Sequence, residues 1–379
     1  MKFIHCIRKE VIKMPMKQIQ RIRRQLHQIP ELDKQLPKTI AYIKQMLSPL
    51  SCTVFQPIPG AVCAYFDFHK TTMLAFRSDM DALPIQEQNA VSYRSTHKGQ
   101  MHACGHDAHM AILLTFAKYL NAVPDCKHNV LLIFQPAEET TGGAKDIIDT
   151  GLFTQYHVDA LFALHVMPKQ KKGTIASKSG YLMAKSAQIT LEIKGRSAHV
   201  AHFNEGKDAL YAALCFVQRI YAISEQYKKE PHLLKFGVCN SGQVCNAISD
   251  DTLLKGTLRV FSDESFHYFH ERLNELCKQL QKESGCDFQL SLSEGYPALV
   301  NNAELFEKSR TLLKEMAILT KADLLTEDFA YYGKVIKSMF FYLGIGDVSP
   351  LHSATFDFDD SCLSEGVNTF IQLLDIEIT

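Results

Sequence analysis

The densest group of metal-binding side-chain types in the sequence lies between residues 102 and 109. The segment reads HACGHDAH and contains three histidines, Cys104 and an aspartate. Thiolate and imidazole groups suit zinc and the neighbouring transition metals. An apolar stretch of helical character follows directly, and functional sites commonly lie in such connecting segments. The segment therefore predicts a metal site, although a polar loop with an incidental cysteine would fit this stretch alone.

Two adjacent acidic residues, Glu138 and Glu139, follow an apolar segment that ends at Pro136. Neighbouring carboxylates repel each other, so one of the two tends to hold a cation or a proton. A hydrolytic site has a use for both, because one can bind a metal while the other accepts a proton from water. A solvated acidic turn is the more common explanation of such a pair taken alone.

Three further candidates are weak individually and stronger together. His165 and His352 would each more often be ordinary structural histidines. Asp79 and Asp81 follow another apolar segment and could orient imidazole ligands through hydrogen bonds. All candidates fall at expected carboxyl ends of strands in one α/β domain, which is where open α/β sheets bind ligands. Their joint placement favours a single site.

The elements that position these residues alternate between helix and strand. This pattern predicts an α/β/α sandwich with a mostly parallel sheet. The two strands nearest the start of the chain are expected to form a hairpin across His69 and Lys70. Helices are predicted within 17–50, with a break near Pro30, and over 107–120, and strands over 61–68, 72–77, 129–136 and 159–166.

A different pattern occupies residues 182–292. Alternating strands and two helices follow the order β-α-β-β-α-β, which is the ferredoxin-like split arrangement. We therefore expect an inserted α+β domain at 182–292. Residues 1–181 and 293–379 would form the catalytic metal-binding domain, with an α-β-α remainder after residue 296. Residues before Met16 are expected to be a frayed extension.

The composition excludes several classes of protein. Lys plus Arg and Asp plus Glu each number 41, so the basic excess of a nucleic-acid-binding protein is missing. Eleven cysteines without a regular spacing indicate reduced thiols in a cytosolic protein. No apolar run approaches the ~18 residues of a membrane span, and the start lacks a signal-peptide pattern. We expect a cytoplasmic protein without nucleic-acid or membrane partners.

Five segments together resemble one family of enzymes. The sequence is similar to the aminoacylase and carboxypeptidase G family of dinuclear metallohydrolases, in particular to its hippurate hydrolase and N-acetyldiaminopimelate deacetylase branch. The resemblance runs from about residue 17 to the end, with the motifs in the family's order. The segments that carry it are RSDMDALPIQEQ, MHACGHDAHMA, FQPAEETTGGAK, ALHVMP and LHSATFDFDD.

The resemblance implies a metal-dependent amidohydrolase with two divalent metal ions per subunit. Zinc is the first choice because of the cysteine, and manganese, nickel or cobalt would also suit such a site. Glu138 would be the general base for the water that the metals activate. The implied metal ligands are Cys104, His106, Glu139, His165 and His352.

The inserted domain carries the remaining implied residues. GRSAHVAHFNEGKDAL resembles the segment whose histidine, here His199, reaches the active site of the partner subunit and helps to hold the oxyanion. GQVCNAISDDTLLKGTLRVF resembles the segment whose Asn and Arg contact the substrate carboxylate, here Asn246 and Arg259. TEDFAYY resembles the family's SEDF segment, without an assigned role for Glu327 and Asp328. The resemblance implies a homodimer in which the inserted domain, residues 182–292, acts as a lid and dimerisation domain.

The substrate class follows in order of preference. N-acetyldiaminopimelate comes first, N-benzoylglycine and other N-acylated amino acids second, and dipeptides or carboxypeptidase substrates third. The alternative of another class is a non-catalytic protein that uses the same fold to bind a metal or a ligand. A structural zinc site is closed and needs no free base beside a ligand, so the pair Glu138 and Glu139 argues against that alternative.

Overall fold

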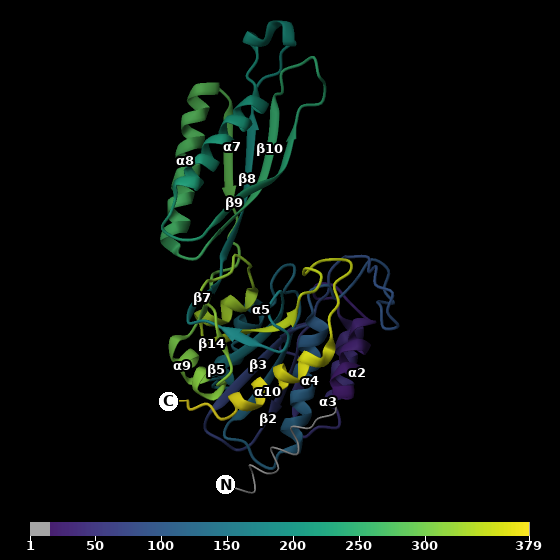
Figure 1. Ribbon diagram of the computed structural model, residues 1–379. Helices are drawn as coiled ribbons and strands as arrows, with labels where there is room; N and C mark the ends of the chain where they lie inside the picture. Colours follow the sequence, from purple (N-terminus) through teal and green to yellow (C-terminus); the bar gives the residue numbers. More distant parts are fainter. Residues whose placement is uncertain (1–15, 379) are drawn as a thin grey trace. The chain divides into compact units, whose positions relative to one another are not determined.

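The computed structural model describes residues 16–378 (Figure 1), so the predicted extension before Met16 lies outside the described residues. The chain forms two compact units. Among the described residues, the first unit comprises 16–182, Val300–Lys321 and 328–378. The second comprises Met183–Leu299 and Ala322–Glu327. The short return at 322–327 was not anticipated from the sequence.

The first unit is built on an eight-stranded sheet with the order β1-β2-β4-β3-β5-β14-β6-β13. Its four neighbouring strands β4, β3, β5 and β14 are parallel and almost entirely buried, as expected where both faces of a sheet are covered. The predicted mostly parallel sheet is therefore confirmed. The strands are β1 (Thr53–Phe55), β2 (Val62–Phe66), β3 (Met73–Asp79), β4 (Asn129–Gln135), β5 (Ala160–Pro168), β6 (Ile175–Ser177), β13 (Ala317–Ile318) and β14 (Lys337–Gly346).

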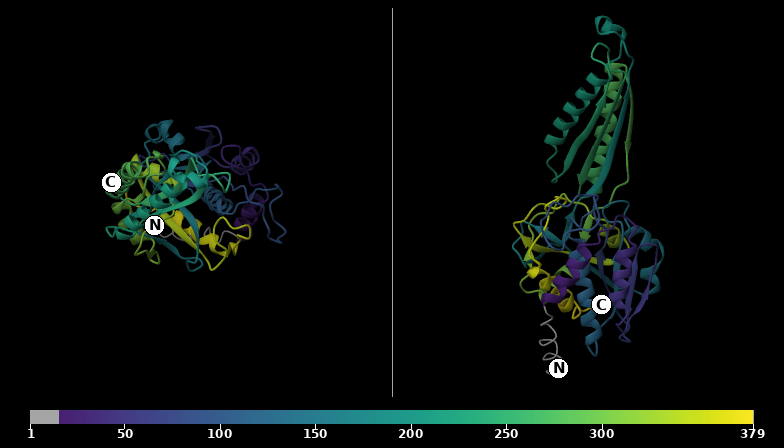
Figure 2. Two further views of the ribbon diagram at one scale, coloured as in Figure 1. Left: turned by 90° about the horizontal axis from the view of Figure 1, so that it is seen from above. Right: turned by 90° about the vertical axis from the view of Figure 1, so that its right-hand side faces the viewer.

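Helices cover both faces of this sheet (Figure 2). Phe76 of β3 packs on Phe116 of α4 and Phe370 of α10, whereas the next residue, Arg77, reaches Asp328 of η2. Successive strand residues point to opposite faces, so α4 and α10 lie on one face and η2 on the other. The helices are α2 (Met16–His27), α3 (Pro37–Leu47), α4 (His106–Ala122), α5 (Ala144–Asp149), α6 (Leu152–Gln155), α9 (Ala303–Leu312), η2 (Asp328–Lys334), η3 (Asp360–Cys362) and α10 (Leu363–Leu373).

The predicted hairpin across His69 and Lys70 is wrong. Strand β2 pairs antiparallel with β4, and β3 pairs parallel with the other side of β4, so β4 lies between them. Asn129, at the start of β4, accepts hydrogen bonds from the backbone N–H groups of Phe68 and Lys70. The short connection therefore spans the position of a third strand instead of closing a turn.

The second unit is a four-stranded antiparallel sheet with the order β11-β8-β10-β9 and two helices. Along the chain its elements follow the predicted β-α-β-β-α-β order, and β8 alternates buried and exposed residues as a half-covered strand does. The predicted ferredoxin-like arrangement is confirmed. The elements are β8 (Lys185–Lys194), η1 (Val200–Glu205), α7 (Ala209–Gln226), β9 (Leu233–Ser241), β10 (Asp251–Val260), α8 (Asp263–Ser284) and β11 (Asp287–Leu292). Strands β7 (Gly180–Met183) and β12 (Leu299–Asn301) pair where the chain passes between the units.

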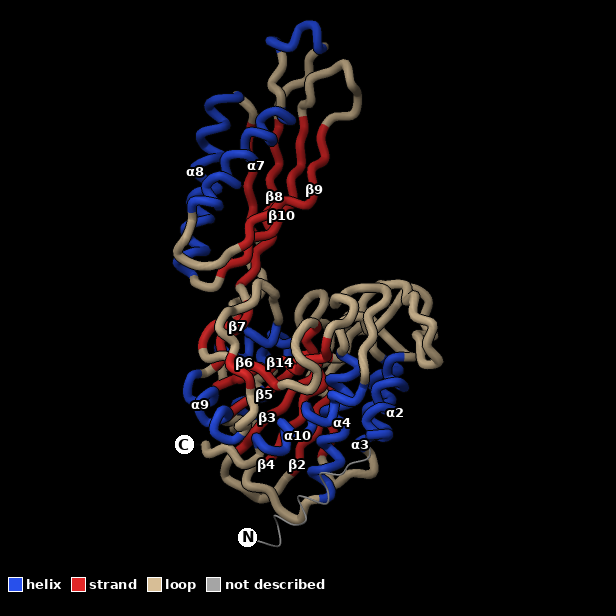
Figure 3. The backbone as a smooth tube through the Cα atoms, viewed as in Figure 1, coloured by secondary structure: helices blue, strands red, loops and turns tan. Residues whose placement is uncertain are grey.

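A long irregular segment, residues 80–105, joins β3 to α4. It contains only isolated bridges and appears among the loops of the first unit in Figure 3. Because it leaves the carboxyl end of one parallel strand and leads into a buried helix, it is placed to carry a site. Among residues 16–378, no helix is long and apolar enough to cross a membrane.

Candidate metal and catalytic site

The predicted ligands converge at the carboxyl ends of the parallel strands. Potential donor atoms fall into overlapping groups whose members lie within 4.8 Å of one another. One group joins Cys104, Glu139 and His352, and another joins His106 with Glu138 and Glu139. These residues come from three connections around the same sheet edge, one after β3, one after β4 and one after β14.

Cys104 lies between two sets of donors. Its Sγ atom is 3.4 Å from Nε2 of His165, whose Nδ1 bonds the Val166 carbonyl at 2.7 Å. Sulfur and nitrogen donors of one tetrahedral zinc ion are separated by roughly 3.5 Å, given their usual bond lengths. On the other side, Nε2 of His352 lies 3.2 Å from Oε1 of Glu139. Cys104, His165, Glu139 and His352 are therefore spaced as side chains that would hold divalent cations.

His106 directs its Nε2 atom into the same space. A carbonyl can only accept, so the 2.8 Å contact with the Asp81 carbonyl assigns a proton to Nδ1. Nε2 is buried and has no hydrogen-bond partner among residues 16–378. It lies 3.8–3.9 Å from carboxylate oxygens of Asp79, Glu138 and Glu139. A buried nitrogen facing three carboxylates fits a cation-binding position.

The protonation of these ligands shows how strongly the site attracts positive charge. Burial opposes a charged imidazole, but Asp79, Asp81 and Glu139 outweigh it and raise the pKa of His106 to about 10. Burial, with the carboxylates of Glu139 and Glu138, raises the pKa of the Cys104 thiol well above its usual value. A metal ion would replace these protons, since thiolate and neutral imidazole are the ligand forms. The donor set therefore fits divalent metal ions.

Asp81 organises the acidic pair and His106 together. Its two carboxylate oxygens accept the backbone N–H groups of Glu138 and Glu139, each at 3.0 Å. Its carbonyl accepts the proton of His106. The sequence had suggested that Asp81 orients an imidazole ligand, and in the structure the residue also fixes the backbone that carries both glutamates.

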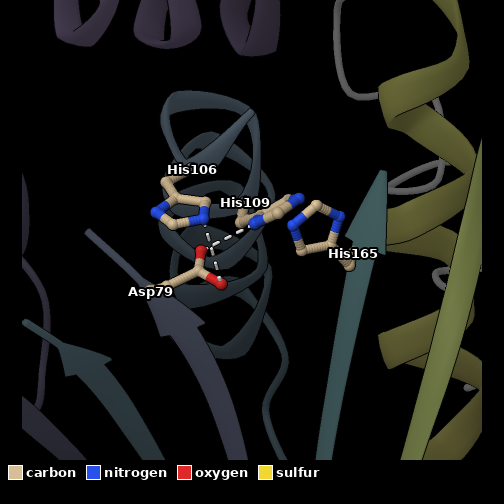
Figure 4. Close-up of side chains that lie close together, drawn as sticks. All are labelled: Asp79, His106, His109 and His165. Carbon is tan, nitrogen blue, oxygen red and sulfur yellow. Dashed lines mark hydrogen bonds and ion pairs between the residues drawn. The ribbon is translucent and has the colours of Figure 1, made fainter. Parts of the chain in front are cut away.

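Asp79 contacts a histidine that was not among the predicted ligands. Nδ1 of His109 lies 2.6 Å from Asp79 Oδ1 (Figure 4). Arg77 donates to Oδ2 of Asp79 at 2.8 Å. Although burial opposes ionisation, His106, His109 and Arg77 hold the pKa of Asp79 well below its usual value. Asp79 is thus a buried carboxylate beside the ligands.

His109 supports the site without a free ligand atom. Its Nε2 accepts the backbone N–H of Val166 at 2.9 Å, so Nδ1 carries the proton that is donated to Asp79. Both ring nitrogens are therefore used. Sequence reasoning gave His109 no role, and the available signal was its spacing from His106, which places both on one side of the first turn of α4. Figure 4 shows both rings above Asp79.

The turn into α4 requires a glycine. Gly105 has φ +89°, and a Cβ there would lie 2.4 Å from Cγ2 of Val166. A larger residue would push the segment with Cys104 and His106 away from β5. The glycine at position 105 therefore allows the segment with Cys104 and His106 to lie close to β5.

A buried ion network lies behind the first turn of α4. Asp107 accepts from Nε of Arg23 at 3.1 Å and contacts Nδ1 of His27 at 2.8 Å. Arg23 also donates to Asp360 at 2.6 Å, which links α2, α4 and the C-terminal segment. Burial opposes the charge on His27, but Asp107 and Glu87 raise its pKa to about 9. No pattern in the sequence indicated this network.

The other predicted residues lie in the second unit. His199 is exposed, its Nδ1 accepts from the backbone N–H of Ala201 at 3.1 Å, and it bridges with Ala247 beside Asn246. Arg259 of β10 donates to the Leu324 carbonyl at 2.7 Å. The roles of His199, Asn246 and Arg259 toward the metal cluster stay predictions.

Comparison with known proteins gives consistent relatives. A hydrolase of Staphylococcus epidermidis with no characterised activity is 32% identical over 367 residues, covering 93% of this chain and 96% of its own length. An N-acetyldiaminopimelate deacetylase of Oceanobacillus iheyensis is 32% identical over 368 residues, covering 95% of this chain and 99% of its own length. The structure of the YXEP protein of Bacillus subtilis is similar to this chain, with a TM-score of 0.84 at 27% identity, covering 95% of this chain and 97% of its own. That protein is described as a dinuclear metal-binding peptidase of family M20.

The family comparison agrees with these relatives and with the resemblance in the sequence. The model of peptidase family M20/M25/M40 matches residues 75–376, which include all the ligand candidates and most of both units. The chain is therefore a hydrolase that belongs to peptidase family M20/M25/M40.

Proposed function

We propose that the protein is a metal-dependent amidohydrolase that cleaves the amide bond of an N-acylated amino acid. The observation that carries the proposal is the pair Glu138 and Glu139, held side by side by Asp81. Glu139 joins the group with Cys104 and His352 and can act as a ligand. Glu138 is then the carboxylate available as a base, with Oε2 3.9 Å from Nε2 of His106.

Five side chains would hold two divalent cations, with Cys104 between the two ligand sets and favouring zinc over manganese, nickel or cobalt. Bound there, the cations would acidify a water molecule and polarise the amide carbonyl. The ligands are Cys104, His106, Glu139, His165 and His352.

The carboxylate of Glu138 performs the proton transfers. It accepts one proton from water as the water oxygen attacks the amide carbon. It then delivers that proton to the amine nitrogen as the carbon–nitrogen bond breaks, which releases a carboxylic acid and an amino acid. Asp81 holds the Glu138 backbone during both transfers through its bond to the N–H group.

The second unit would supply the residues that bind the substrate. Arg259 and Asn246 are the proposed contacts of the amino acid carboxylate, since a guanidinium can bind a carboxylate in two-pronged fashion. His199 would reach the site of a partner subunit and help to hold the oxyanion. This scheme implies a homodimer through the second unit, and we place the enzyme in the cytoplasm.

N-acetyldiaminopimelate is the first proposed substrate, supported by the name of the Oceanobacillus iheyensis relative. N-benzoylglycine and other N-acylated amino acids follow. A dipeptidase or carboxypeptidase activity is the second candidate, supported by the description of the YXEP protein as a peptidase. A panel of N-acetyl, N-benzoyl and dipeptide substrates, each with several metals, distinguishes these classes by kcat/KM.

The central test compares the same substitution at two adjacent positions. Glu138→Gln should lower kcat for acetate release by at least about 10²-fold while both metals remain bound, since only the base is lost. Glu139→Gln should instead lower the metal content, because a ligand is lost. If Glu138→Gln keeps kcat within about tenfold of wild type, the assignment of the base is wrong. Full activity of metal-stripped protein would exclude the whole scheme.

A further inference from the structure

The loop that carries Glu138 and Glu139 has a constrained backbone. It runs over residues 136–142, between the end of β4 and the start of α5. Ala137 has φ +61°, which is unfavourable for a residue with a Cβ, and Gly142 has φ +80°. The Gly142 N–H bonds the Ala137 carbonyl at 2.9 Å and closes the loop on itself. Such a conformation persists only where surrounding contacts impose it.

One carboxylate, that of Asp328, binds both ends of this loop. Oδ2 of Asp328 accepts from the backbone N–H groups of Gly143 at 2.8 Å and Ala144 at 3.0 Å, directly after the loop. The same oxygen accepts from Nε2 of Gln135 at 2.8 Å, directly before the loop. Asp328 is completely buried. The loop therefore begins and ends on a single side chain.

Arg77 balances the charge of Asp328 and connects it to the ligand cluster. Its Nη2 donates to Oδ1 of Asp328 at 3.0 Å, and its Nη1 donates to Asp79 at 2.8 Å. Its Nε donates to Oε1 of Gln135 at 2.9 Å, and Tyr332 donates to the same oxygen at 2.9 Å. A buried network in which donors and acceptors are matched in this way is rigid.

The two ends of the loop are also packed too closely for any side chain. A Cβ on Gly143 would lie 2.1 Å from the carbonyl oxygen of Pro136. The glycine therefore lets the ends meet, and Asp328 holds them together. With both ends fixed, the positions of Glu138 and Glu139 within the loop are fixed as well.

We propose that Asp328 is a positioning residue, which sets the place of the base Glu138 and the ligand Glu139 by clamping residues 135 and 143–144. The inference rests on the proposed function of Glu138. The role of Asp328 is to hold the backbone, and the chemical steps belong to the loop that it holds.

Asp328→Asn tests this role, because the amide NH₂ would face donors that a carboxylate accepts. At saturating metal and on folded protein, kcat should fall about 10–100-fold, the usual cost of losing an orienting partner, while KM changes less than threefold. In metal-free protein, the amides of Gly143 and Ala144 should exchange hydrogen at least about tenfold faster.

Asn129→Ala is the matched control. Asn129 lies at the opposite end of β4 from Gln135, is 8% exposed and binds a different loop through Phe68 and Lys70. Its loss should lower thermal stability, yet leave kcat within about twofold and the exchange of Gly143 and Ala144 unchanged. If Asn129→Ala slows turnover as much as Asp328→Asn, the effect is general destabilisation and the inference is wrong.

A double variant separates this inference from the proposed function. If Asp328 acts through Glu138, Asp328→Asn should slow the wild type but add less than about threefold to Glu138→Gln, because the two changes remove one function. An inactive Glu138→Gln beside a fully active Asp328→Asn would overturn the clamp alone. An active Glu138→Gln would overturn the proposed function, while the exchange measurement would still decide whether the clamp exists.

Discussion

At the scale of single residues, protons and metal ions would compete for the proposed ligands. Cys104 and His106 both hold protons in the absence of a cation, since the pKa of the thiol is raised by burial and nearby carboxylates and that of the imidazole is raised to about 10. Both must lose these protons to bind metal. The site combines a strong attraction for cations with a strong dependence on pH.

Metal affinity should therefore rise as the pH rises from 6 to 8. Binding of each ion releases protons, so the dissociation constant for zinc should fall with increasing pH until the ligands are fully deprotonated. Calorimetric titration in buffers of different ionisation enthalpy counts the released protons. A dissociation constant that stays constant over this range would contradict the assignment of Cys104 and His106 as ligands.

His27 makes a separate contribution to stability. Its folded pKa of about 9 exceeds the unfolded value of 6.5, so its stabilisation is complete below pH 6.5 and is lost as pH rises through 9. The shift corresponds to at most about 3 kcal/mol of unfolding free energy. Urea unfolding between pH 6.5 and 9.5 should show this decline in the wild type.

His27→Gln keeps a hydrogen-bonding side chain but cannot titrate, so it should flatten that part of the pH profile. The variant His157→Gln controls for the loss of an exposed histidine, because His157 lies in a turn after α6. A decline of equal size in His27→Gln and wild type would show that another group is responsible.

At the scale of elements, the start of α4 has to fit against β5. Gly105→Ala should destabilise the fold by about 1–3 kcal/mol, since a left-handed backbone costs energy and the new methyl group would overlap Val166. Because Cys104 and His106 flank the position, metal affinity should fall as well. Thermal unfolding and metal titration measure the two effects.

Gly151→Ala separates the two causes. Gly151 has φ +76° and directly precedes α6. Among residues 16–378, no heavy atom outside the adjoining residues lies within 4 Å of a Cβ placed there. This variant should show only the backbone cost, about 1 kcal/mol, with unchanged metal affinity. Equal losses in the two variants would mean that the contact with Val166 does not matter.

The helices and strands were largely predictable from the sequence, whereas the pairing of the strands was less predictable. Periodicity locates α4, β4 and β5, because burial of apolar side chains shapes each segment locally. The hairpin between β2 and β3 was predicted wrongly because the strand that separates them, β4, is distant in sequence. Local sequence patterns do not show which strand, distant in sequence, pairs between two consecutive strands.

The same distinction holds within the site. Motifs indicated Cys104, Glu138 and Glu139 because their residue types are chemically unusual together. They included His109 and Asp328 but gave neither a role, because their roles depend on backbone groups of Val166 and Gly143 that approach only after folding. Residues that support a site through tertiary contacts carry little signal of their own.

At the scale of the whole molecule, the two units have separate apolar cores. Phe269 is completely buried in the core of the second unit, and Phe269→Ala should destabilise that unit by about 3–5 kcal/mol. Hydrogen exchange should increase in α7 and α8, while zinc affinity of the first unit stays unchanged. Loss of protection in α4 and β4 at the same time would show that the units unfold as one.

The proposed dimer makes a further prediction. Tyr211 and Leu214 lie on α7 with 66% and 57% of their surface exposed, so two large hydrophobic side chains are available on the surface of the second unit. The double variant Tyr211→Glu and Leu214→Glu should be monomeric in light scattering, bind both metals and hydrolyse substrate at least about 10²-fold more slowly, since His199 would no longer reach a partner's site.

Val335→Glu serves as the matched control, because Val335 is 55% exposed in the first unit. It should leave both the molecular mass and the activity unchanged. A monomeric and fully active double variant would contradict the proposed role of His199 in the partner subunit.

The strand order of the first unit has a consequence for the synthesis of the protein. Strand β14 pairs along the length of β5 but is translated only after the second unit, as is His352. During synthesis on the ribosome, one edge of β5 therefore remains unpaired until β14 has been made. The second unit can already fold at that stage, because its main segment is continuous. Cys104, His106, Glu139 and His165 emerge long before their last partner. A nascent chain should acquire its full affinity for metal only at release, when the final strand and His352 arrive.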